Sequence, residues 1–329
     1  MMPISKIDPS KNQLFFRGMN ATELSRSSNF EESLYLLVNG QLPSHEELRT
    51  ISRRMIELRN LYHEDMDSLF DLAGRMNRIR KENCLTMFDT LLAFVSLAPL
   101  VVAYDLGLNQ FKKSQSPDKR LGHAANFLWM TRGIISKEED LRDFQSSLIL
   151  HMDDPDNPSL SALEKNVNEG KSISDILLAA LTIHIGALHH GAGAEAMRMF
   201  EEVREKTDVK TYLEQRLESG EKIYGLGHRI YTGVDPRAIV LRKMLERRVT
   251  NTKHQWLLHI ADSIAKEGRL LLAEYKEIDA FPNVDLYNAA VYFTLGFPPE
   301  LNTSLFAVSR SAGWMAHVLE CYKHQQVKK

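Results

Sequence analysis

Helix-start signals followed by apolar stripes dominate this sequence. The segments Ser28-Asn-Phe-Glu31, Ser44-His-Glu-Glu47 and Ser136-Lys-Glu-Glu139 each place a hydroxyl three residues before a carboxylate. In such a capping box the two side chains bond backbone N–H groups that the first turn of a helix leaves unsatisfied. Apolar residues follow at spacings of three and four, which is typical of a helix that buries one face. Gly40 and Gly133 mark helix ends.

Strand signals are weak by comparison. No period-two alternation of apolar and polar residues is sustained, and no Asn-Gly or Asp-Gly turn joins two β-branched runs. The apolar stretch from Leu91 to Tyr104 is shorter than the roughly 20 residues that span a membrane. Ser96 and Pro99 interrupt it, so we expect a pair of buried helices there. These patterns predict an all-α fold.

Composition excludes several classes of protein. With 329 residues the chain exceeds the usual size of one core, which favours two domains. A formal net charge of −2 argues against a nucleic-acid partner. The 2 cysteines have no disulfide or zinc-site spacing, so we expect no metal and a reducing compartment. The N-terminus, MMPISKIDPSKNQ, has no apolar leader, and we expect a cytoplasmic protein without membrane contact.

Four segments carry unusual polar chemistry. Glycines surround two histidines in GALHHGAGAEAM (186–197), and KIYGLGHRIYTGVDPR (222–237) sets a histidine beside exposed backbone donors and arginines. Asp285 follows a Pro- and Asn-marked loop, and Arg310 lies in an apolar helical stretch. Each alone has an ordinary structural explanation: a core histidine, a helix cap or a buried ion pair. Together they predict a site for an anionic ligand.

These segments resemble the citrate synthase family. GLGHRIYTGVDPR (225–237) is similar to the signature G-F/Y-G-H-x-V-Y-x-x-x-D-P-R, and GALHHGAG (186–193) to GPLHGGAN. NVDLYNAAVYFTLGFPPEL (283–301) resembles NVDFYSGIVYYxLGFPxEL, and FAVSRSAGWMAHVLE (306–320) resembles FAISRVVGWLAHIIE. Upstream, LGHAANFLWM (121–130) is similar to the LSHAANFLYM of shorter archaeal and bacterial members. The blocks keep the family order from about residue 14 to residue 320.

The resemblance implies a large helical domain with an inserted small helical domain, assembled as a two-fold homodimer. Carried over, the large dimerisation domain is 1–190 with 297–329, and the small CoA-binding, catalytic domain is 191–296. The apolar helix within 172–188 would then lie at the dimer interface.

The resemblance also implies the reaction: condensation of acetyl-CoA, or another short acyl-CoA, with oxaloacetate to give citrate, or 2-methylcitrate, and CoA. This is an acyltransferase reaction of the tricarboxylic acid cycle, with CoA as cosubstrate and no permanently bound cofactor. The implied catalytic residues are His189, His228 and Asp285. The implied substrate-binding residues are His151, Asp154, Asn157, Arg237, Phe306 and Arg310. The implied CoA-binding residues are Lys222, Ile223, Tyr224, Gly225, Leu226 and Gly227.

The sequence departs from the family in two places. The pattern H-x-x-H-x-x-N-x-S reads His151-Met-Asp-Asp154-Pro-Asp-Asn157-Pro-Ser159, so a carboxylate replaces the second histidine, an implied oxaloacetate ligand. No arginine follows Arg310, where the family supplies one to the partner's active site. Two alternatives therefore stay open: an enzyme that uses another 2-oxo acid or acts as a citryl-CoA lyase, and a non-catalytic CoA-binding homologue.

Overall fold

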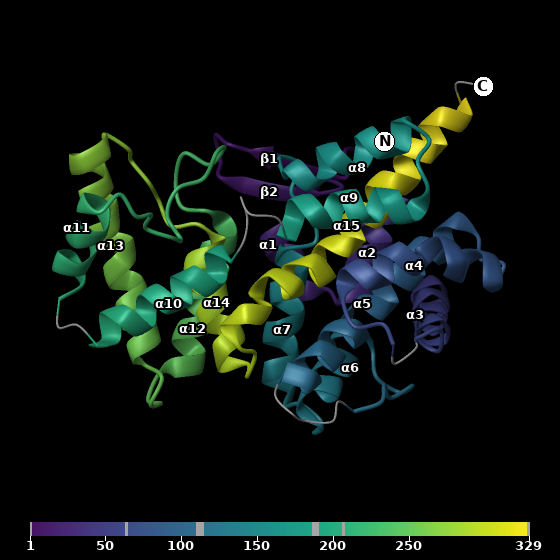
Figure 1. The fold of residues 1–329 in the computed structure, drawn as a ribbon, viewed down its shortest axis with the longest axis horizontal. Coiled ribbons are helices and arrows are strands. Elements are labelled where there is room, and N and C mark those ends of the chain that lie inside the picture. Colours follow the sequence, from purple (N-terminus) through teal and green to yellow (C-terminus); the bar gives the residue numbers. More distant parts are fainter. Residues whose placement is uncertain (1, 63–64, 110–114, 186–190, 206–207, 328–329) are drawn as a thin grey trace. The chain divides into compact units, whose positions relative to one another are not determined.

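The computed structural model of the chain is described at residues 2–62, 65–109, 115–185, 191–205 and 208–327. The helices are α1 (Ala21–Ser27), α2 (Phe30–Asn39), α3 (His45–Arg59), α4 (Leu69–Glu82), α5 (Met87–Asn109), α6 (His123–Arg132), α7 (Glu138–Leu150), α8 (Pro158–Asn168), α9 (Ile173–Ile185), α10 (Ala192–Glu205), α11 (Val209–Glu218), α12 (Pro236–Val249), α13 (Trp256–Lys276), α14 (Val284–Thr294) and α15 (Asn302–Val327), with the short 3-10 helix η1 (Pro299–Leu301). Figure 1 shows these helices along the whole chain. The predicted all-α class is confirmed.

One small sheet was not expected from the sequence. The strands are β1 (Ser5–Asp8), β2 (Gln13–Phe16) and β3 (Met19–Asn20), in the order β1-β2-β3. Arg17 and Gly18 join the last two, with φ of 47° and 84°. Positive φ at both loop residues suits a tight hairpin turn, and here Arg-Gly takes the place of the usual Asn-Gly. The alternation in β2 lasts only four residues, so it left no sustained pattern.

The predicted helix starts are correct in one case and wrong in two. Ser44 and Glu47 form the capping box of α3 as expected. The box of α2 uses Asn29 and Glu32, one residue later than predicted, because an Asn side chain caps as well as Ser and is followed by a glutamate in the same register. Helix α7 has Lys137 at its N-cap and no side-chain cap, so the predicted cap residue Ser136 lies one residue too early to cap the helix. Gly40 and Gly133 end their helices in the left-handed conformation, as predicted.

The apolar stretch around Pro99 is one helix and not the predicted helix pair. Proline removes a single helical hydrogen bond, and burial on nearly all sides keeps α5 continuous. The part Met87–Gly107 is long and apolar enough to cross a membrane, but 78% of its apolar window is buried inside the structure, as in a core helix.

The chain divides into two compact units. Unit 1 comprises Met1–Lys6, Phe15–His190 and Ser304–Lys329. Unit 2 comprises Ile7–Leu14 and Gly191–Thr303. The domain roles expected for 1–190 with 297–329 and for 191–296 stay a prediction.

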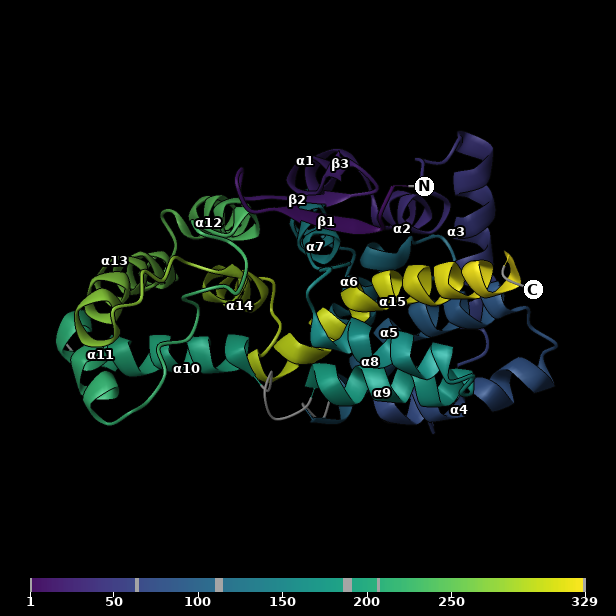
Figure 2. The same ribbon diagram turned by 90° about the horizontal axis from the view of Figure 1, so that it is seen from above.

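Each unit has its own helical core. In unit 1, α5 packs on α3, α4 and α6, and α9 packs on α4 and α8. Figures 1 and 2 show α15 running alongside α8 in this unit, where Trp314 bonds to Ser159. In unit 2, α14 packs on α10, α12 and α13, and α11 packs on α13.

A buried histidine lies inside unit 1. The ring of His123 stacks on Phe30, with centroids 4.0 Å apart, and its backbone N–H donates to Glu31 at 2.7 Å. Neither ring nitrogen has a hydrogen-bond partner among the described residues. Burial, together with the charge of Arg59, holds the pKa of His123 well below its usual 6.5. The imidazole is therefore neutral in the folded protein.

This neutral histidine predicts acid sensitivity. Because the folded pKa is depressed, its contribution to stability is complete above pH 6.5, the value of the unfolded group, and is lost as pH falls below it. The free energy of unfolding should fall by up to about 1.4 kcal/mol per pH unit there from this group alone. Denaturant unfolding between pH 7.5 and 5 should show a shallower decline in His123→Phe. The exposed His45→Gln serves as the control, and equal slopes in both variants would contradict the assignment.

Candidate active site

Two loops far apart in the sequence are hydrogen-bonded in unit 2. The backbone N–H of Gly227 donates to the carbonyl of Phe281 at 2.7 Å, and that of Asn283 donates to Gly225 at 2.9 Å. The side-chain amide of Asn283 adds a bond to the carbonyl of Gly227 at 2.8 Å. The glycine-rich segment of the sequence is thereby fixed against the start of α14, which carries Asp285.

Gly225 permits this close approach. Its φ is +86°, and a Cβ atom there would lie 2.8 Å from Cα of Leu286 and 2.7 Å from its Cβ. Any side chain would clash with the first turn of α14 and would strain the backbone. The loop conformation therefore requires glycine at this position.

Asp285 has the properties of a general base. Asn283 caps α14 by accepting from the backbone N–H of Asp285 at 2.9 Å. Burial raises the pKa of Asp285 to about 6, although the nearby Arg237 lowers it, and the charge of Asp235 raises it further. At pH 7 the carboxylate is mostly ionised, and a base with a pKa near the working pH is well matched to proton abstraction.

Arg237 lies at the start of α12 and is buried. Its guanidinium holds the carboxylate of Asp235, with Nη2 at 2.8 Å from Oδ2 and Nε at 3.0 Å from Oδ1. Asp235 also caps the helix by accepting from the backbone N–H of Arg237. This fork-like pairing fixes the orientation of the guanidinium.

His228 is contacted by N–H groups at both ring nitrogens. Its Nδ1 accepts from the backbone N–H groups of Ile230 and Tyr231, at 3.2 and 3.3 Å. In the neutral ring the proton must then reside on Nε2. Nε2 lies 3.5 Å from Nη2 of Arg237. The imidazole and the guanidinium are therefore adjacent, and both groups can bond an oxygen atom of a ligand.

The expected CoA-binding segment also lies in unit 2. The carbonyl of Lys222 accepts from Nε of Arg216 at 3.2 Å, and the backbone N–H of Tyr224 approaches Sδ of Met199 at 3.5 Å. The side chain of Lys222 is exposed and that of Ile223 is buried. Leu226 follows, between the two glycines that bond to the opposite loop.

A second group of predicted residues lies in unit 1. His151 caps the C-terminus of α7 and is fully buried, with Nδ1 at 2.5 Å from the carbonyl of Ser147. Its ring centroid is 4.0 Å from that of Phe306. Nε of Arg310 donates to the carbonyl of His151 at 2.9 Å, and Arg310 is 1% exposed. The histidine, the phenylalanine and the arginine therefore form one cluster.

Asp154 and Asn157 belong to the turn between α7 and α8. Oδ1 of Asp154 accepts from the backbone N–H of Asp156 at 3.2 Å, and its carbonyl accepts from that of Asn157 at 3.1 Å. Asn157 caps α8 by accepting from Ser159, with Pro158 at the first helical position, where proline is favoured. Asp154 is 9% exposed, so its carboxylate is largely withdrawn from water.

The structure thus gathers the predicted residues into two clusters, one in each unit. The unit 1 cluster contains His151, Asp154, Asn157, Phe306 and Arg310. The unit 2 cluster contains Lys222, Ile223, Tyr224, Gly225, Leu226, Gly227, His228, Arg237 and Asp285. The third expected catalytic residue, His189, lies outside the described residues.

Sequence reasoning missed three residues of the unit 1 cluster. The ring of His184 lies 6.5 Å from that of Phe306. Asp153, which is buried two residues after His151, forms an ion pair with His317. His317 follows Arg310 by seven residues and so shares its helix face, a spacing that could have indicated it.

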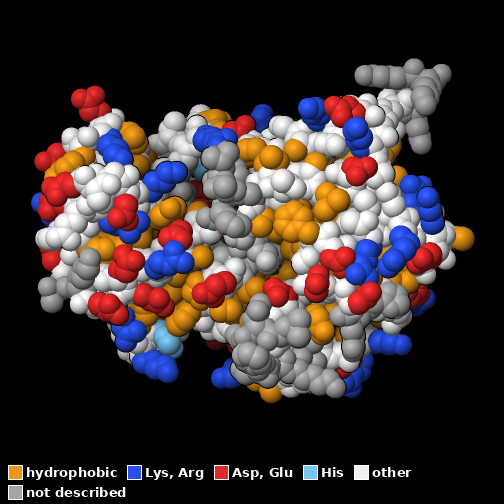
Figure 3. Space-filling model, in the orientation of Figure 1, with side chains coloured by type: hydrophobic (Ala, Val, Ile, Leu, Met, Phe, Trp, Pro, Cys, Tyr) orange, Lys and Arg blue, Asp and Glu red, His pale blue; other side chains and the backbone are white. Residues whose placement is uncertain are grey.

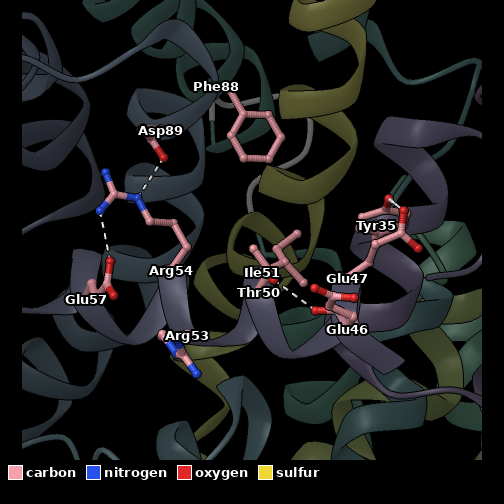
Figure 4. Close-up of a pocket in the computed structure, with 10 residues that line it drawn as sticks. All are labelled: Tyr35, Glu46, Glu47, Thr50, Ile51, Arg53, Arg54, Glu57, Phe88 and Asp89. Carbon is pink, nitrogen blue, oxygen red and sulfur yellow. Dashed lines mark hydrogen bonds and ion pairs between the residues drawn. The ribbon is translucent and has the colours of Figure 1, made fainter. Parts of the chain in front are cut away.

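A surface hollow lies apart from these clusters. It has a volume of about 600 Å³ and lies between α3 and α5 of unit 1 (Figure 4). Arg54 there bonds to Asp89 at 2.8 Å and to Glu57 at 3.0 Å. The described residues that line it include none of the expected site residues.

Other features of the described chain concern metals and charge. Among the described residues no group of three or more His, Cys, Asp and Glu side chains could hold a metal ion. Figure 3 shows acidic and basic side chains mixed over the visible face. Such mixing is typical of a near-neutral protein surface.

Comparisons with known proteins agree with this architecture and these motifs. The family model described as citrate synthase, C-terminal domain, matches residues 1–328. The citrate synthase of Haloferax volcanii is 31% identical over 349 residues, covering 98% of this chain and 90% of that protein. The 2-methylcitrate synthase 1 of Corynebacterium glutamicum is 28% identical, covering 98% and 88%. The crystal structure of citrate synthase from Pyrobaculum aerophilum superposes with a TM-score of 0.84 at 28% identity, covering 98% of this chain and 86% of that one. The chain therefore belongs to the citrate synthase family, enzymes that transfer an acyl group in a condensation reaction.

Proposed function

We propose that the protein condenses acetyl-CoA, or another short acyl-CoA, with oxaloacetate to give citrate, or 2-methylcitrate, and CoA. The family supports this reaction, because relatives are named both citrate synthase and 2-methylcitrate synthase. The observation that carries the proposal is the unit 2 cluster. There, a carboxylate with a pKa of about 6 accompanies an oriented arginine and a histidine of fixed tautomer.

The first step would be enolisation. Asp285 takes a proton from the methyl group of the acyl-CoA, and the electron pair moves onto the thioester oxygen. His189 would donate a hydrogen bond to that oxygen and so stabilise the developing negative charge. The product of this step is the enolate of the thioester, with the proton on Asp285.

The second step would form the carbon–carbon bond. The enolate carbon attacks the ketone carbon of oxaloacetate, and the ketone oxygen becomes an alkoxide. His228 delivers its Nε2 proton to that oxygen, which gives citryl-CoA. Water then attacks the thioester carbonyl, so that the C–S bond breaks and CoA leaves as the thiol.

The substrate carboxylates would be held by Arg237 and Arg310, whose guanidinium groups have their orientation fixed by neighbours. His151 and Asn157 would complete the oxo-acid contacts, and Phe306 would pack beside them. Residues 222–227 would hold the adenine end of CoA, and CoA is a cosubstrate in this scheme. No permanently bound cofactor takes part.

Asp154 favours a second candidate function. A buried carboxylate near a dianionic oxo acid repels it, at a cost of roughly 1 to 3 kcal/mol in a poorly solvated site. An oxo acid with less negative charge would avoid this repulsion. The alternatives are accordingly a synthase for another 2-oxo acid or a citryl-CoA lyase, and lastly a CoA-binding homologue without activity.

We further propose a cytoplasmic homodimer that contacts neither membranes nor nucleic acids. Helix α9 would contribute to the dimer interface, since it is apolar on most sides and Ile183 remains 39% exposed. Cys84 and Cys321 are free thiols, which suits a reducing compartment.

Removing the base should abolish turnover. In an assay that follows thiol release, Asp285→Ala should lower kcat by about 10²- to 10⁴-fold with an unchanged thermal unfolding midpoint. In the wild type, kcat/KM should fall as pH drops below about 6, because protonated Asp285 cannot accept a proton. Asp279→Ala, at an exposed aspartate just before the same loop, is the control. Activity that survives in Asp285→Ala would refute the proposed base.

Restoring a histidine at position 154 should strengthen oxo-acid binding. Asp154→His replaces a repulsive acceptor by a donor, so the KM for oxaloacetate should fall about tenfold while the KM for acetyl-CoA stays constant. The same substitution at the exposed Asp156 should leave both constants unchanged. An unchanged oxaloacetate KM in Asp154→His would show that this side chain does not face the oxo acid. A wild type silent with oxaloacetate but active with another 2-oxo acid or citryl-CoA would establish the alternative function.

A side chain at Gly225 should disrupt the active loop. Gly225→Ala places a Cβ against the backbone of Leu286, so the loop and Asp285 must separate and activity should fall at least about tenfold. Gly220→Ala is the matched control, because Gly220 also has a positive φ, of +77°, but has nothing within 4 Å of the added atom. Equal losses in the two variants would attribute the effect to backbone strain alone.

A further inference from the structure

The segment that carries His151 rests on one face of α15. The helix residues involved are spaced by three and four, so they share that face. Each bonds to a successive residue of the segment 151–153. The bonds are Arg310 Nε to the carbonyl of His151 at 2.9 Å, the backbone N–H of Gly313 to the carbonyl of Met152 at 3.2 Å, and His317 Nε2 to Oδ2 of Asp153 at 3.0 Å.

In the middle of this face, the backbone of Gly313 lies directly against the carbonyl oxygen of Met152. A Cβ atom on Gly313 would lie 2.4 Å from the carbonyl oxygen of Met152 and 2.7 Å from Oδ1 of Asp153. Real Cβ atoms do not approach other atoms so closely, so the segment can seat on α15 only at a glycine. Small shifts of the segment are therefore resisted on this side.

Charged side chains hold the far end of the segment. Asp153 is fully buried, and its Oδ2 accepts from Oγ of Ser5 at 2.5 Å as well as from His317. Nδ1 of His317 lies 3.4 Å from Oε1 of Glu164 on α8. The imidazole thus lies between two carboxylates that come from different parts of unit 1.

The surroundings of the imidazole fix its charge. Burial alone would lower the pKa of His317, but the charges and hydrogen bonds of Asp153 and Glu164 raise it to about 9. Burial would likewise raise the pKa of Asp153, but His317, Arg310 and Ser5 together lower it. Cys321 lies one turn further along α15, and its thiol pKa is raised by burial and by the charges of Glu164 and Glu320. At neutral pH the group is therefore an imidazolium between two carboxylates.

We propose that His317 is a positioning residue for the oxo-acid site: its contacts with Asp153 and Glu164 fix the segment 151–157 so that His151, Asp154 and Asn157 are presented to the substrate. The proposal rests on the proposed function, because that function assigns the oxo acid to this segment. Without the imidazolium, the buried Asp153 keeps only the hydrogen bond from Ser5 and the charge of Arg310, and the segment is expected to shift toward water.

The first test replaces His317 by glutamine, which keeps a hydrogen-bond donor and removes the charge. The KM for the oxo acid should rise about 10- to 100-fold, while the KM for acyl-CoA should stay within about twofold. Glu320→Gln is the matched control. Glu320 lies on the same helix as His317, and its ion pair with Arg17 does not involve the segment 151–157. Equal oxo-acid KM values in the two variants would overturn the proposal.

The second test uses pH. Because the pKa of His317 is raised to about 9, the imidazolium, and with it the positioning, persists until pH rises through about 9. The wild-type KM for the oxo acid should therefore increase above about pH 9. In His317→Gln this increase should vanish, and its persistence there would overturn the proposal.

The third test asks whether charge is the cause. Asp153→Asn alone leaves His317 paired only with Glu164 and should raise the oxo-acid KM, whereas Asp153→Asn combined with His317→Gln makes these two positions neutral. The oxo-acid KM of the double variant should be at least about threefold lower than that of either single variant. Additive losses would contradict a charge-based positioning role.

A fourth measurement does not depend on activity. Hydrogen exchange at pH 7 should show about tenfold faster exchange of amides 148–157 in His317→Gln than in Glu320→Gln. If this difference is present but the wild type condenses no substrate, the proposed function fails and the positioning role stands. If exchange is equal in the two variants, the positioning role fails whatever the activity.

Discussion

The seating of the segment 148–159 on α15 is the interaction on which the rest of unit 1 depends. Side chains of one helix bond to the end of α7, to the following turn and to the first turn of α8. Ser309 bonds to Leu148, Arg310 to His151, and Trp314 to Ser159, the last at 3.0 Å. These partners are buried, so each bond would leave an unsatisfied polar group if it broke. The helix therefore acts as a rigid template for a turn that has no regular structure of its own.

Unit 2 solves the same problem by a different means. The loop that contains Gly225 and Gly227 is held by backbone hydrogen bonds to the loop that contains Phe281 and Asn283. At Gly225 the approach to Leu286 is too close for any side chain larger than hydrogen. The capping of two helices then fixes the functional carboxylate and guanidinium, because Asn283 and Asp235 bond to the residues that follow them. In both units, side chains assigned to the site are held in place by hydrogen bonds to neighbouring residues.

Local patterns predicted what local physics decides. The cap at Ser44 and the helix ends at Gly40 and Gly133 could be located because each depends on residues within one turn. The cap at Asn29 was missed because two registers were equally plausible one residue apart.

The arrangement of the site could not be predicted in this way. Asp153 and His317 are separated by 164 positions, and Asn283 and Gly227 by 56. Motifs and family resemblance identified His228, Asp285 and Arg310 as site residues. They did not identify His317, although it shares the helix face of Arg310, because spacing alone does not distinguish a supporting histidine from any other polar residue on that face. Contacts between residues so far apart in the sequence depend on how the helices pack, and local sequence patterns do not reveal that packing.

The two backbone N–H groups that donate hydrogen bonds to Nδ1 of His228 restrict how this side chain can transfer protons. An imidazole that relays protons takes one up on one nitrogen and gives one up from the other. Here the rear nitrogen is occupied by the backbone N–H groups of Ile230 and Tyr231. In the proposed reaction, a proton that leaves Nε2 would therefore have to come back to Nε2. Regeneration of the histidine would then require the Nε2 side of the ring to be accessible to a proton donor.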